Sequence, residues 1–336
     1  MNSAPNCTII IFTGRRLPPV YYFGEMYMMW LDKPYHSLDY EMKTRYGHKV
    51  YKIAISGGFT CPTRDGSLDT RGCLFCSAGG SGEFSQPPSV SISKQIEDGK
   101  QLLAGKKTGS RYIAYFQAFT STYAPIERLR TLYTEAISHP DVEILSIATR
   151  PDCLPEPILD LLEEMNRIKP VWVELGFQTA NETSAELIRR GFSNDVFASA
   201  VRSLKARGIE TITHLILGLP GETAEDMLRS VQYIAAQKTD GVKIQMLQVL
   251  KGTDLADSYA AQPFHLLTLE EYTDILISCI ERMPQECVIH RITGDPPKRL
   301  LIAPRWTADK KHVLNYIHHR FKERKTFQGR IQGEIL

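Results

Sequence analysis

Short apolar runs alternate with longer amphipathic segments along most of the chain. Seven runs are apolar at nearly every position, which predicts strands buried on both faces, as in a parallel sheet. They cover residues 50–56, 111–119, 142–149, 171–178, 210–219, 242–250 and 287–293, the last with the weakest pattern. Between the runs, apolar residues recur at helical spacing in residues 92–105, 125–138, 154–168, 183–191, 195–208 and 222–237.

This alternation predicts one α/β domain with a barrel-like parallel sheet, because no Gly/Ser-rich linker interrupts the βα repeats. In such a barrel the carboxyl ends of the strands meet at one rim, where ligands bind. The predicted strands end at a cysteine-containing loop, at Gln117, at residues 149–152, at Gln178, at residues 218–223 and near Gln248. We therefore expect these polar groups to lie together, with Gln117 and Gln248 beside a cofactor.

Composition and charge narrow the function little. The chain has 40 basic and 38 acidic residues, a net charge of +2, and 43% hydrophobic residues, as in many globular proteins. No apolar stretch approaches the roughly 18 residues that a membrane span requires. Residues 1–28 hold a short apolar run without a signal-peptide cleavage site. We expect this segment to be a loosely ordered extension; an added edge strand at residues 8–12 is the alternative.

Three cysteines carry the strongest chemical signal. Cys73 and Cys76 form a C-x-x-C pair, and Cys61 precedes Cys73 by twelve positions, across a loop rich in Gly, Pro, Asp and Thr. The pair can bind one metal centre, and the loop can bring in the third thiolate. Three cysteine ligands leave one position open for a small ligand. The strand before this loop and the glycine run after it favour a [4Fe–4S] cluster whose fourth iron is free.

Other interpretations of the cysteines stay open on the residues alone. A structural zinc site needs a fourth ligand, for which His48 is the nearest imidazole. A thioredoxin-like C-x-x-C pair would begin a helix and would not require Cys61. A disulfide framework is disfavoured, because seven cysteines in 336 residues are few and odd in number. Cys279 falls in an apolar helical repeat typical of a core, and a second cluster from Cys153, Cys279 and Cys287 is a further alternative.

Several segments together resemble the radical SAM superfamily, and within it the Elongator-catalytic-subunit-like branch with the bacterial YhcC/YtqA type. They are GGFTCPTRDG, GCLFC, YFQAFTSTYAP, TRPDC, ELGFQTAN, LILGLPGET and RITGDPPKRLLIAPRW. The resemblance implies a partial (βα)6 TIM-like radical SAM barrel over residues 29–306 and a short C-terminal helical extension over residues 307–336. It also implies a [4Fe–4S] cluster and S-adenosylmethionine, whose one-electron cleavage would yield a 5′-deoxyadenosyl radical that abstracts a substrate hydrogen.

The resemblance assigns roles to particular positions. Cys61, Cys73 and Cys76 would hold the cluster, and Phe75 would lie against the adenine. The glycine-rich run 79–83 would meet the methionine amino group, because glycine lets backbone approach a ligand closely. The expected cofactor-binding residues are Phe75, Gly80, Gly82, Glu83, Gln117, Arg190, Gly218 and Gln248.

Two further positions are expected to be catalytic. Glu174 and Gln178 match rim positions that face cofactor or substrate in the family, although Glu174 could instead form a structural ion pair. Arg190 would bind the cofactor carboxylate, or it could be one more solvated helix charge. Ala148 stands where many relatives carry an acid, and Phe192 stands where a histidine often follows. These departures affect the substrate pocket rather than the cofactors.

The C-terminal segment suggests a substrate class. Residues 310–330 carry seven Lys or Arg against one Glu, and Val313, Leu314, Ile317 and Phe321 recur at helical spacing. One face can therefore dock on the barrel while the basic face binds a phosphate backbone; the alternative is an amphipathic helix that closes the barrel with a solvated face.

The Elongator-like resemblance favours tRNA. We expect a cytoplasmic enzyme that modifies a wobble uridine derivative in tRNA, with no membrane contact and with flavodoxin or ferredoxin as its electron donor. A small metabolite or a protein side chain is the alternative substrate. A noncatalytic metal- or RNA-binding module is the alternative of another class.

Overall fold

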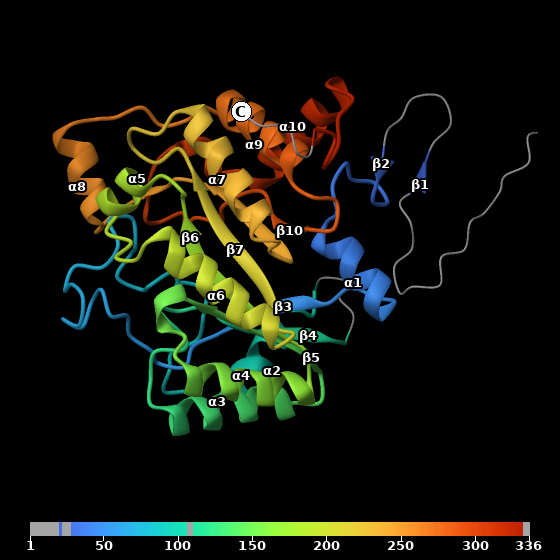
Figure 1. Ribbon diagram of the computed structural model, residues 1–336, viewed down its shortest axis with the longest axis vertical. Coiled ribbons are helices and arrows are strands. Elements are labelled where there is room, and N and C mark those ends of the chain that lie inside the picture. The colour runs from blue at the N-terminus through green and yellow to red at the C-terminus, as the bar shows by residue number, and fades with distance from the viewer. Residues whose placement is uncertain (1–19, 22–27, 106–109, 332–336) are drawn as a thin grey trace, which may run out of the picture.

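A sheet of seven parallel strands forms the centre of the computed structural model, which describes residues 20–21, 28–105 and 110–331. The strand order is β10-β8-β7-β6-β5-β4-β3, so each strand lies beside the next parallel strand of the chain. The sheet curls into a partial barrel (Figure 1). Its strands are β3 (Tyr51–Ile55), β4 (Tyr112–Phe116), β5 (Val142–Thr149), β6 (Val171–Gln178), β7 (Glu210–Leu217), β8 (Gly241–Met246) and β10 (Val288–Arg291).

Helices cover the outer face of this sheet (Figure 1). Helices α7 (Ala224–Ala236) and α9 (Leu269–Arg282) begin with capping boxes. In these, Thr223 with Asp226 and Thr268 with Glu271 accept hydrogen bonds from the first backbone N–H groups. All five residues of β4 are buried, as expected for a strand with packing on both faces. The outer helices are α2 (Ile92–Leu103), α3 (Ile126–Ser138), α4 (Glu156–Ile168), α6 (Asn194–Ala206), α7 (Ala224–Ala236) and α9 (Leu269–Arg282).

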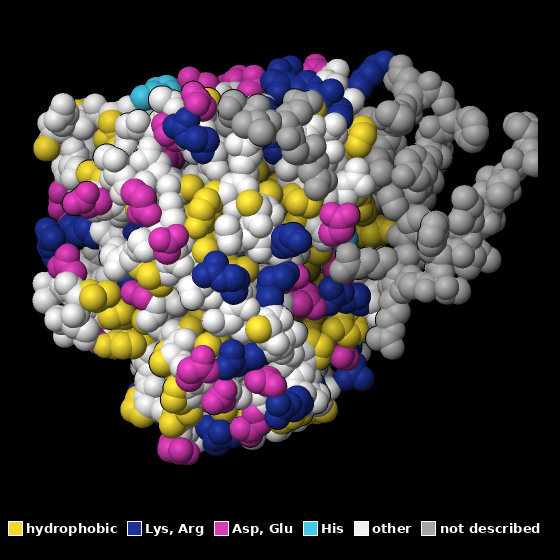
Figure 2. Space-filling model, viewed as in Figure 1, with side chains coloured by type: hydrophobic (Ala, Val, Ile, Leu, Met, Phe, Trp, Pro, Cys, Tyr) yellow, Lys and Arg dark blue, Asp and Glu magenta, His cyan; other side chains and the backbone are white. Residues whose placement is uncertain are grey.

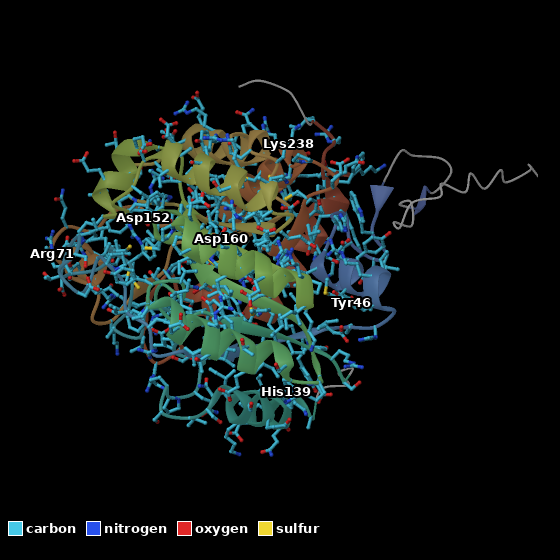
Figure 3. All side chains as sticks on the ribbon, turned by 60° about the horizontal axis from the view of Figure 1, so that its bottom comes forward. Tyr46, Arg71, His139, Asp152, Asp160 and Lys238 are labelled. Atoms are coloured by element: carbon cyan, nitrogen blue, oxygen red, sulfur yellow. The ribbon has the colours of Figure 1, made fainter. Side chains whose placement is uncertain are left out.

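Helix α1 (Leu38–Tyr46) closes the amino-terminal end of the barrel. Met42 of this helix is buried, and Leu38 and Tyr46 are partly buried beside it. In Figure 3, Tyr46 and Arg71 of the cysteine loop lie at opposite ends of the molecule, so the plugged end is far from the cysteines. The residues that pack against α1 come from the first positions of the strands: Val50, Ile113, Ile144, Trp172 and Ile212.

The C-terminal helix α10 (Lys310–Glu323) packs on the barrel through Val313, Ile317 and Phe321, which are all buried. The Tyr35 hydroxyl lies 3.0 Å from His318 Nε2 on the same helix. Before α10, β11 (Leu301–Ala303) pairs antiparallel with β9 (Val249–Leu250). The helical extension that the resemblance implied is confirmed, as is the fold class.

Some local expectations differ from the structure. The run 242–250 is two elements, because the chain leaves the sheet at Leu247 after β8 and continues as β9. Both parts are buried, so the apolar pattern could not reveal the break. The segment 183–191 forms only the short α5 (Glu182–Leu187), and α8 (Asp254–Ala261) and α1 were not expected.

Two expectations concerned the N-terminal segment and membrane-spanning helices. Apart from the short strands β1 (Val20–Tyr21) and β2 (Met28–Met29), the expected extension at residues 1–28 lies outside the described residues, as does the alternative strand at residues 8–12. Within the described residues, no helix combines the length and apolar character needed to cross a membrane.

Candidate active site

One large cavity of about 1120 Å³ runs through the inside of the partial barrel. All three candidate cluster cysteines line it, and so do residues of every parallel strand from β3 to β10. Among the expected site residues, all but Gly82 and Gly218 line this cavity. Strand ends that are far apart in sequence are therefore brought to one site, as the βα pattern predicted.

The cysteine loop has a defined backbone. The N–H of Arg64 donates to the carbonyl of Cys61 at 2.8 Å, and the N–H of Cys76 donates to the carbonyl of Cys73 at 3.0 Å, so both cysteine segments form tight turns. The Arg64 guanidinium donates to the carbonyls of Cys76 and Ser77 at 2.9 and 2.7 Å. This arginine, which the sequence analysis did not single out, ties the two parts of the loop together.

The thiols lie in a poorly solvated environment. Burial, together with the neighbouring Cys76, raises the pKa of Cys73 to about 12. Burial also raises the pKa of Cys76. Both side chains are therefore protonated at neutral pH until an iron ion displaces the proton, because only the thiolate is a good metal ligand.

The spacing of the cysteines bears on the zinc alternative. Among the residues that the structure describes, the sulphurs of Cys61, Cys73 and Cys76 do not all lie within 4.8 Å of one another. Ligand atoms on one tetrahedral zinc, with Zn–S of about 2.3 Å, would lie about 4 Å apart. His48 sits before β3, beside Tyr46, at the end of the strand away from Cys61. A cluster binds each thiolate at a different iron, so it does not require the thiolates to lie this close together.

The glycine-rich run after the cysteines folds back on the loop that follows β4. Gly80 has φ +59° and accepts a hydrogen bond from the N–H of Phe119 at 2.9 Å. A Cβ on Gly80 would lie 2.4 Å from the Phe119 ring, so this position requires glycine. Glu83 accepts a hydrogen bond from the Ser77 hydroxyl. Gly82 packs against Ala118 behind the cavity wall, and its cofactor role stays a prediction.

Glutamine side chains occupy the rim at the strand ends. Gln178 has φ +68°, and the register between β6 and β7 shifts just before it. A non-glycine residue in this conformation is strained, which is common at functional sites. The Gln248 amide nitrogen is buried and has no hydrogen-bond partner among the described residues. With Gln117, these side chains offer free polar groups to a ligand in the cavity.

Arg190 and Gly218 are less directly placed. The Arg190 side chain is 2% exposed, and its guanidinium donates to the carbonyl of Thr179 at 2.6 Å and to Glu182 at 2.9 Å. Arg190 is therefore not a solvated helix charge, because its guanidinium is hydrogen-bonded within the protein. Its role toward a cofactor carboxylate stays a prediction. Gly218 has φ +85° and packs against Leu267 outside the cavity lining.

Below the cysteines, a layer of polar side chains crosses the barrel, and Glu174 lies at its centre. One Glu174 oxygen accepts from the Ser146 hydroxyl at 2.7 Å and pairs with Lys52. The other accepts from His214 Nε2 at 2.7 Å and pairs with Lys243. We call Lys52, Tyr115, Ser146, Glu174, His214, Lys243 and His290 the polar layer.

The charges of the polar layer are set by this pairing. Burial would raise the pKa of Glu174, but Lys243 and Lys52 outweigh burial and hold it well below its usual range, so the group is a carboxylate. Burial and the Lys243 ammonium lower the pKa of His214 to about 4, which makes this imidazole neutral at pH 7. The expectation that Glu174 faces the site and the alternative of an ion pair therefore both hold.

Sequence reasoning missed the basic members of this layer. Lys52 and Lys243 each stand as the one charge within an otherwise apolar strand, YKIAI and GVKIQM. A lone charge in a buried strand is unusual enough to have been a signal, because buried charges need partners. Arg150, which lies near Cys73 and stacks over Phe192, was also missed.

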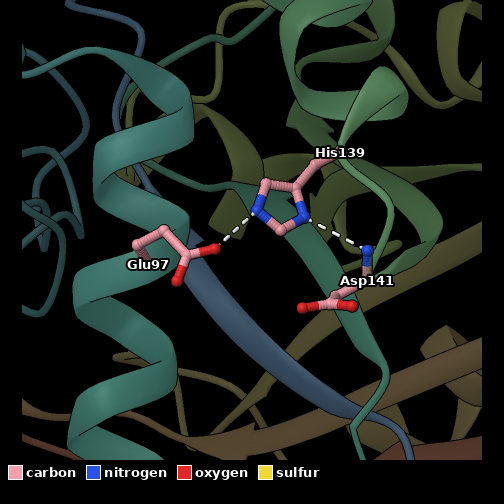
Figure 4. Close-up of side chains that lie close together, drawn as sticks. All are labelled: Glu97, His139 and Asp141. Carbon is pink, nitrogen blue, oxygen red and sulfur yellow. Dashed lines mark hydrogen bonds and ion pairs between the residues drawn. The ribbon is translucent and has the colours of Figure 1, made fainter.

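A separate group of metal-ligand side chains lies on the outer surface. Glu97, His139 and Asp141 bring their ligand atoms within 4.8 Å of one another (Figure 4). However, the Lys100 ammonium already pairs with both carboxylates, at 2.8 and 2.6 Å. His139 Nε2 pairs with Glu97 at 2.9 Å. This group is accounted for by its own ion pairs.

Among the described residues, Cys153, Cys279 and Cys287 form no close group of metal-ligand atoms. Cys279 and Cys287 are buried in the main hydrophobic core between sheet and helices, as expected for Cys279. Cys153 lies in the short turn after β5, and burial raises the pKa of its thiol to about 12. All three side chains behave as small apolar groups in this structure.

Comparisons with known proteins identify the family. The Radical SAM superfamily matches residues 70–234, and the Radical_SAM C-terminal domain matches residues 239–323. The uncharacterized protein YtqA of Bacillus subtilis (strain 168) is 40% identical over 299 residues, which cover 89% of this chain and 93% of that protein. Protein YhcC of Escherichia coli (strain K12) is 35% identical over 283 residues, covering 84% of this chain and 90% of that protein.

More distant similarities extend to the Elongator branch. The tRNA uridine(34) acetyltransferase of Methanocaldococcus infernus is 27% identical over 189 residues, which cover 55% of this chain and 34% of that protein. The solved structure of the Methanocaldococcus infernus Elp3 with an N-terminal deletion superposes with a TM-score of 0.65 at 18% identity, covering 83% of this chain and 64% of that one. This superposition shows a shared fold.

The residues of the cavity fit the cofactors of the superfamily. Cys61, Cys73 and Cys76 line this cavity and offer three thiol ligands. The cavity exceeds the roughly 300–1,000 Å³ of common small-molecule sites, which leaves room for a substrate group beside a nucleoside cofactor. The unpartnered Gln248 amide lies on its wall. The chain belongs to the radical SAM superfamily and is an enzyme that uses a [4Fe–4S] cluster and S-adenosylmethionine.

Proposed function

We propose that this enzyme acts in the cytoplasm on a uridine derivative at the wobble position of tRNA. When bound, the cluster and S-adenosylmethionine supply the one-electron chemistry that removes a hydrogen atom from the substrate. The protein holds the cluster through Cys61, Cys73 and Cys76 and excludes water from the barrel. In this proposal Gln117 and Gln248 bind the cofactor at the rim, and Gln178 faces the cofactor or the substrate.

The observation that carries the proposal is the charge of the cavity. Its charged side chains are mostly basic, although the chain as a whole is nearly neutral. On the face seen in Figure 2, basic and acidic side chains are interspersed. An anionic polymer fits such a lining. The basic residues are Lys52, Arg64, Arg150, Arg190, Lys243, Arg291, Lys298, Lys310 and Lys311, against Glu83, Glu174, Asp295 and Asp309.

The mouth of the cavity supplies the phosphate contacts. Lys298, Lys310 and Lys311 line it, and all three side chains are exposed. Lys310 pairs with Asp295 at 2.7 Å, whereas Lys298 and Lys311 are in no ion pair within the described residues. The predicted basic tail therefore acts through the first turn of α10 and the loop before β11.

The printed name of one archaeal relative supports uridine in tRNA as the substrate. This relative, a tRNA uridine(34) acetyltransferase, is similar to the chain over 34% of its own length. We infer that the barrel of this chain acts on the same class of substrate.

A binding and turnover experiment tests the proposal. After anaerobic reconstitution and reduction by dithionite or flavodoxin, bulk tRNA should stimulate formation of 5′-deoxyadenosine more than a metabolite extract does. Lys311→Ala should weaken tRNA binding and lower the salt dependence of log Kd by about one unit, because one phosphate contact is lost. Lys322→Ala, an exposed lysine of α10 away from the cavity, is the matched control. Stimulation by the metabolite extract alone, without tRNA binding, would refute the tRNA substrate.

A further inference from the structure

The polar layer is an ordered arrangement that the chemistry of the cofactors does not require. Neighbouring strands contribute its members at similar depth: Lys52 from β3, Tyr115 from β4, Glu174 from β6, His214 from β7 and Lys243 from β8. Below it, the α1 plug and the Trp172 side chain close the barrel. Above it, the same cavity continues to the cysteines. The layer is therefore the closed end of the substrate cavity.

The layer sets two lysine side chains against a single carboxylate. Lys52 and Lys243 both pair with the single carboxylate of Glu174. His214 is neutral, so no further charge comes from it. The Arg291 guanidinium, at the edge of the cavity, lies 3.4 Å from Asp295. Burial lowers the pKa of Lys243 well below its usual range although Glu174 pairs with it, so the charged form of this lysine is costly unless a further anion joins it.

Hydrogen-bond donors in the layer remain free. His290 Nδ1 is buried and has no partner among the described residues, although its ring is held against Trp172 at 5.1 Å between centroids. Lys243 is 6% exposed and contacts Glu174 and the Tyr115 hydroxyl, which uses two of its three N–H donors. Lys52 contacts Glu174 and lies over the Tyr115 ring. Lys52 and Lys243 therefore each retain a donor, and His290 Nδ1 donates in the tautomer that carries its proton on that nitrogen.

We propose that the polar layer is a subsite for a small oxyanion, a carboxylate or phosphate group, bound by Lys52, Lys243 and His290. Glu174 acts as a positioning residue that holds both ammonium groups toward the cavity. The subsite deepens the proposed function: if tRNA is the substrate, the group that enters the barrel is acidic or is accompanied by a small anion. Its binding of an anion does not depend on tRNA being the substrate.

Isothermal titration of the full-length, anaerobically reconstituted enzyme with S-adenosylmethionine present tests the subsite. Acetate and inorganic phosphate should bind, and the neutral isostere acetamide should not. Lys243→Gln and Lys52→Gln should each weaken acetate binding on the order of tenfold or more, because a charge-assisted hydrogen bond is lost. Lys205→Gln is the control, since Lys205 is also ion-paired, with Asp240 at 3.3 Å, but lies outside the cavity.

Folding defects are separated from loss of the subsite by two further variants. Lys52→Arg keeps the charge and should retain binding. Glu174→Gln/Lys243→Gln removes one charge of each sign, so it should fold and hold iron yet bind acetate weakly. Equal binding of acetate and acetamide by the wild type, or acetate binding by both lysine variants equal to that of the wild type, would overturn the proposal.

Treated tRNA distinguishes the sources of the anion. Coupling of bulk tRNA to methylamine by carbodiimide neutralises carboxylates and leaves phosphodiesters intact. Loss of stimulation of 5′-deoxyadenosine formation would place the anion on the tRNA itself, and a requirement for added acetate or phosphate with either tRNA would identify a separate small anion. If no tRNA stimulates the enzyme, the proposed function fails, while the acetate titration still decides the subsite.

Discussion

Glu174→Gln provides the sharpest test of how the barrel interior is held together. The Glu174 side chain is fully buried and pairs with Lys52 and Lys243, so glutamine leaves two ammonium groups without a counter-charge. Removal of one partner from a buried pair costs about 3–5 kcal/mol. Because Lys52 remains partly exposed, at 20% of its side chain, we expect the lower end, about 3 kcal/mol of unfolding free energy.

A double-mutant cycle measures the coupling directly. Lys243→Gln leaves Glu174 paired with Lys52 and should cost about 2 kcal/mol, and the double variant should cost about 3 rather than 5 kcal/mol. Anaerobic urea unfolding gives these values, and iron analysis should show an intact cluster in every variant because the cysteines lie at the other end of the cavity. Additive losses, or a cost below 1 kcal/mol for Glu174→Gln, would refute the reasoning.

Three further predictions concern separate features. Burial raises the pKa of Glu222 from 4.5 to about 7, so the stability that its protonated form contributes is complete below about pH 4.5 and is lost as the pH rises through 7. In the wild type this loss should reach up to about 3 kcal/mol of unfolding free energy, and in Glu222→Gln it should be absent when urea unfolding is measured from pH 4 to 8. Met42→Ala should lower unfolding free energy by about 2–5 kcal/mol, whereas exposed Glu225→Ala should change it little. Gly80→Ala should weaken S-adenosylmethionine binding without loss of iron, because its Cβ would displace the Phe119 ring; unchanged affinity would contradict this.

The order of the strands could be read from the sequence because burial on both faces leaves continuous apolar runs such as YIAYF of β4. The same pattern predicted that the polar residues at the strand ends lie at one rim, since the carboxyl ends of parallel strands lie on one side of the sheet. The break after Met246 could not be predicted, because apolar residues recur through both β8 and β9 and no glycine or proline separates them. The plug α1 was hidden for another reason: its apolar face is only Leu38, Met42 and Tyr46, and the partners of that face come from distant strands.

The residues of the candidate site could likewise be predicted only in part. Cys61, Cys73 and Cys76 were predicted from their spacing in the chain, and the structure brings all three to the cavity lining. The partners of Glu174 were not, because Lys52 and Lys243 stand 122 and 69 residues from it and meet it only when the barrel forms. Arg190 was expected to face a cofactor carboxylate, yet its contacts to Thr179 and Glu182 depend on the turn after β6. Local spacing therefore predicted the cofactor end of the cavity, and tertiary contacts determined its closed end.

The most direct test of the account is the yield of 5′-deoxyadenosine from the anaerobically reconstituted, reduced enzyme with S-adenosylmethionine. We predict that the wild type and Cys153→Ala form the product, whereas Cys61→Ala, Cys73→Ala and Cys76→Ala lose both the product and the brown iron–sulphur chromophore. Retained product in any of the three variants, or none from a wild type with an intact and reducible cluster, would contradict the assignment of this cavity as a radical SAM active site.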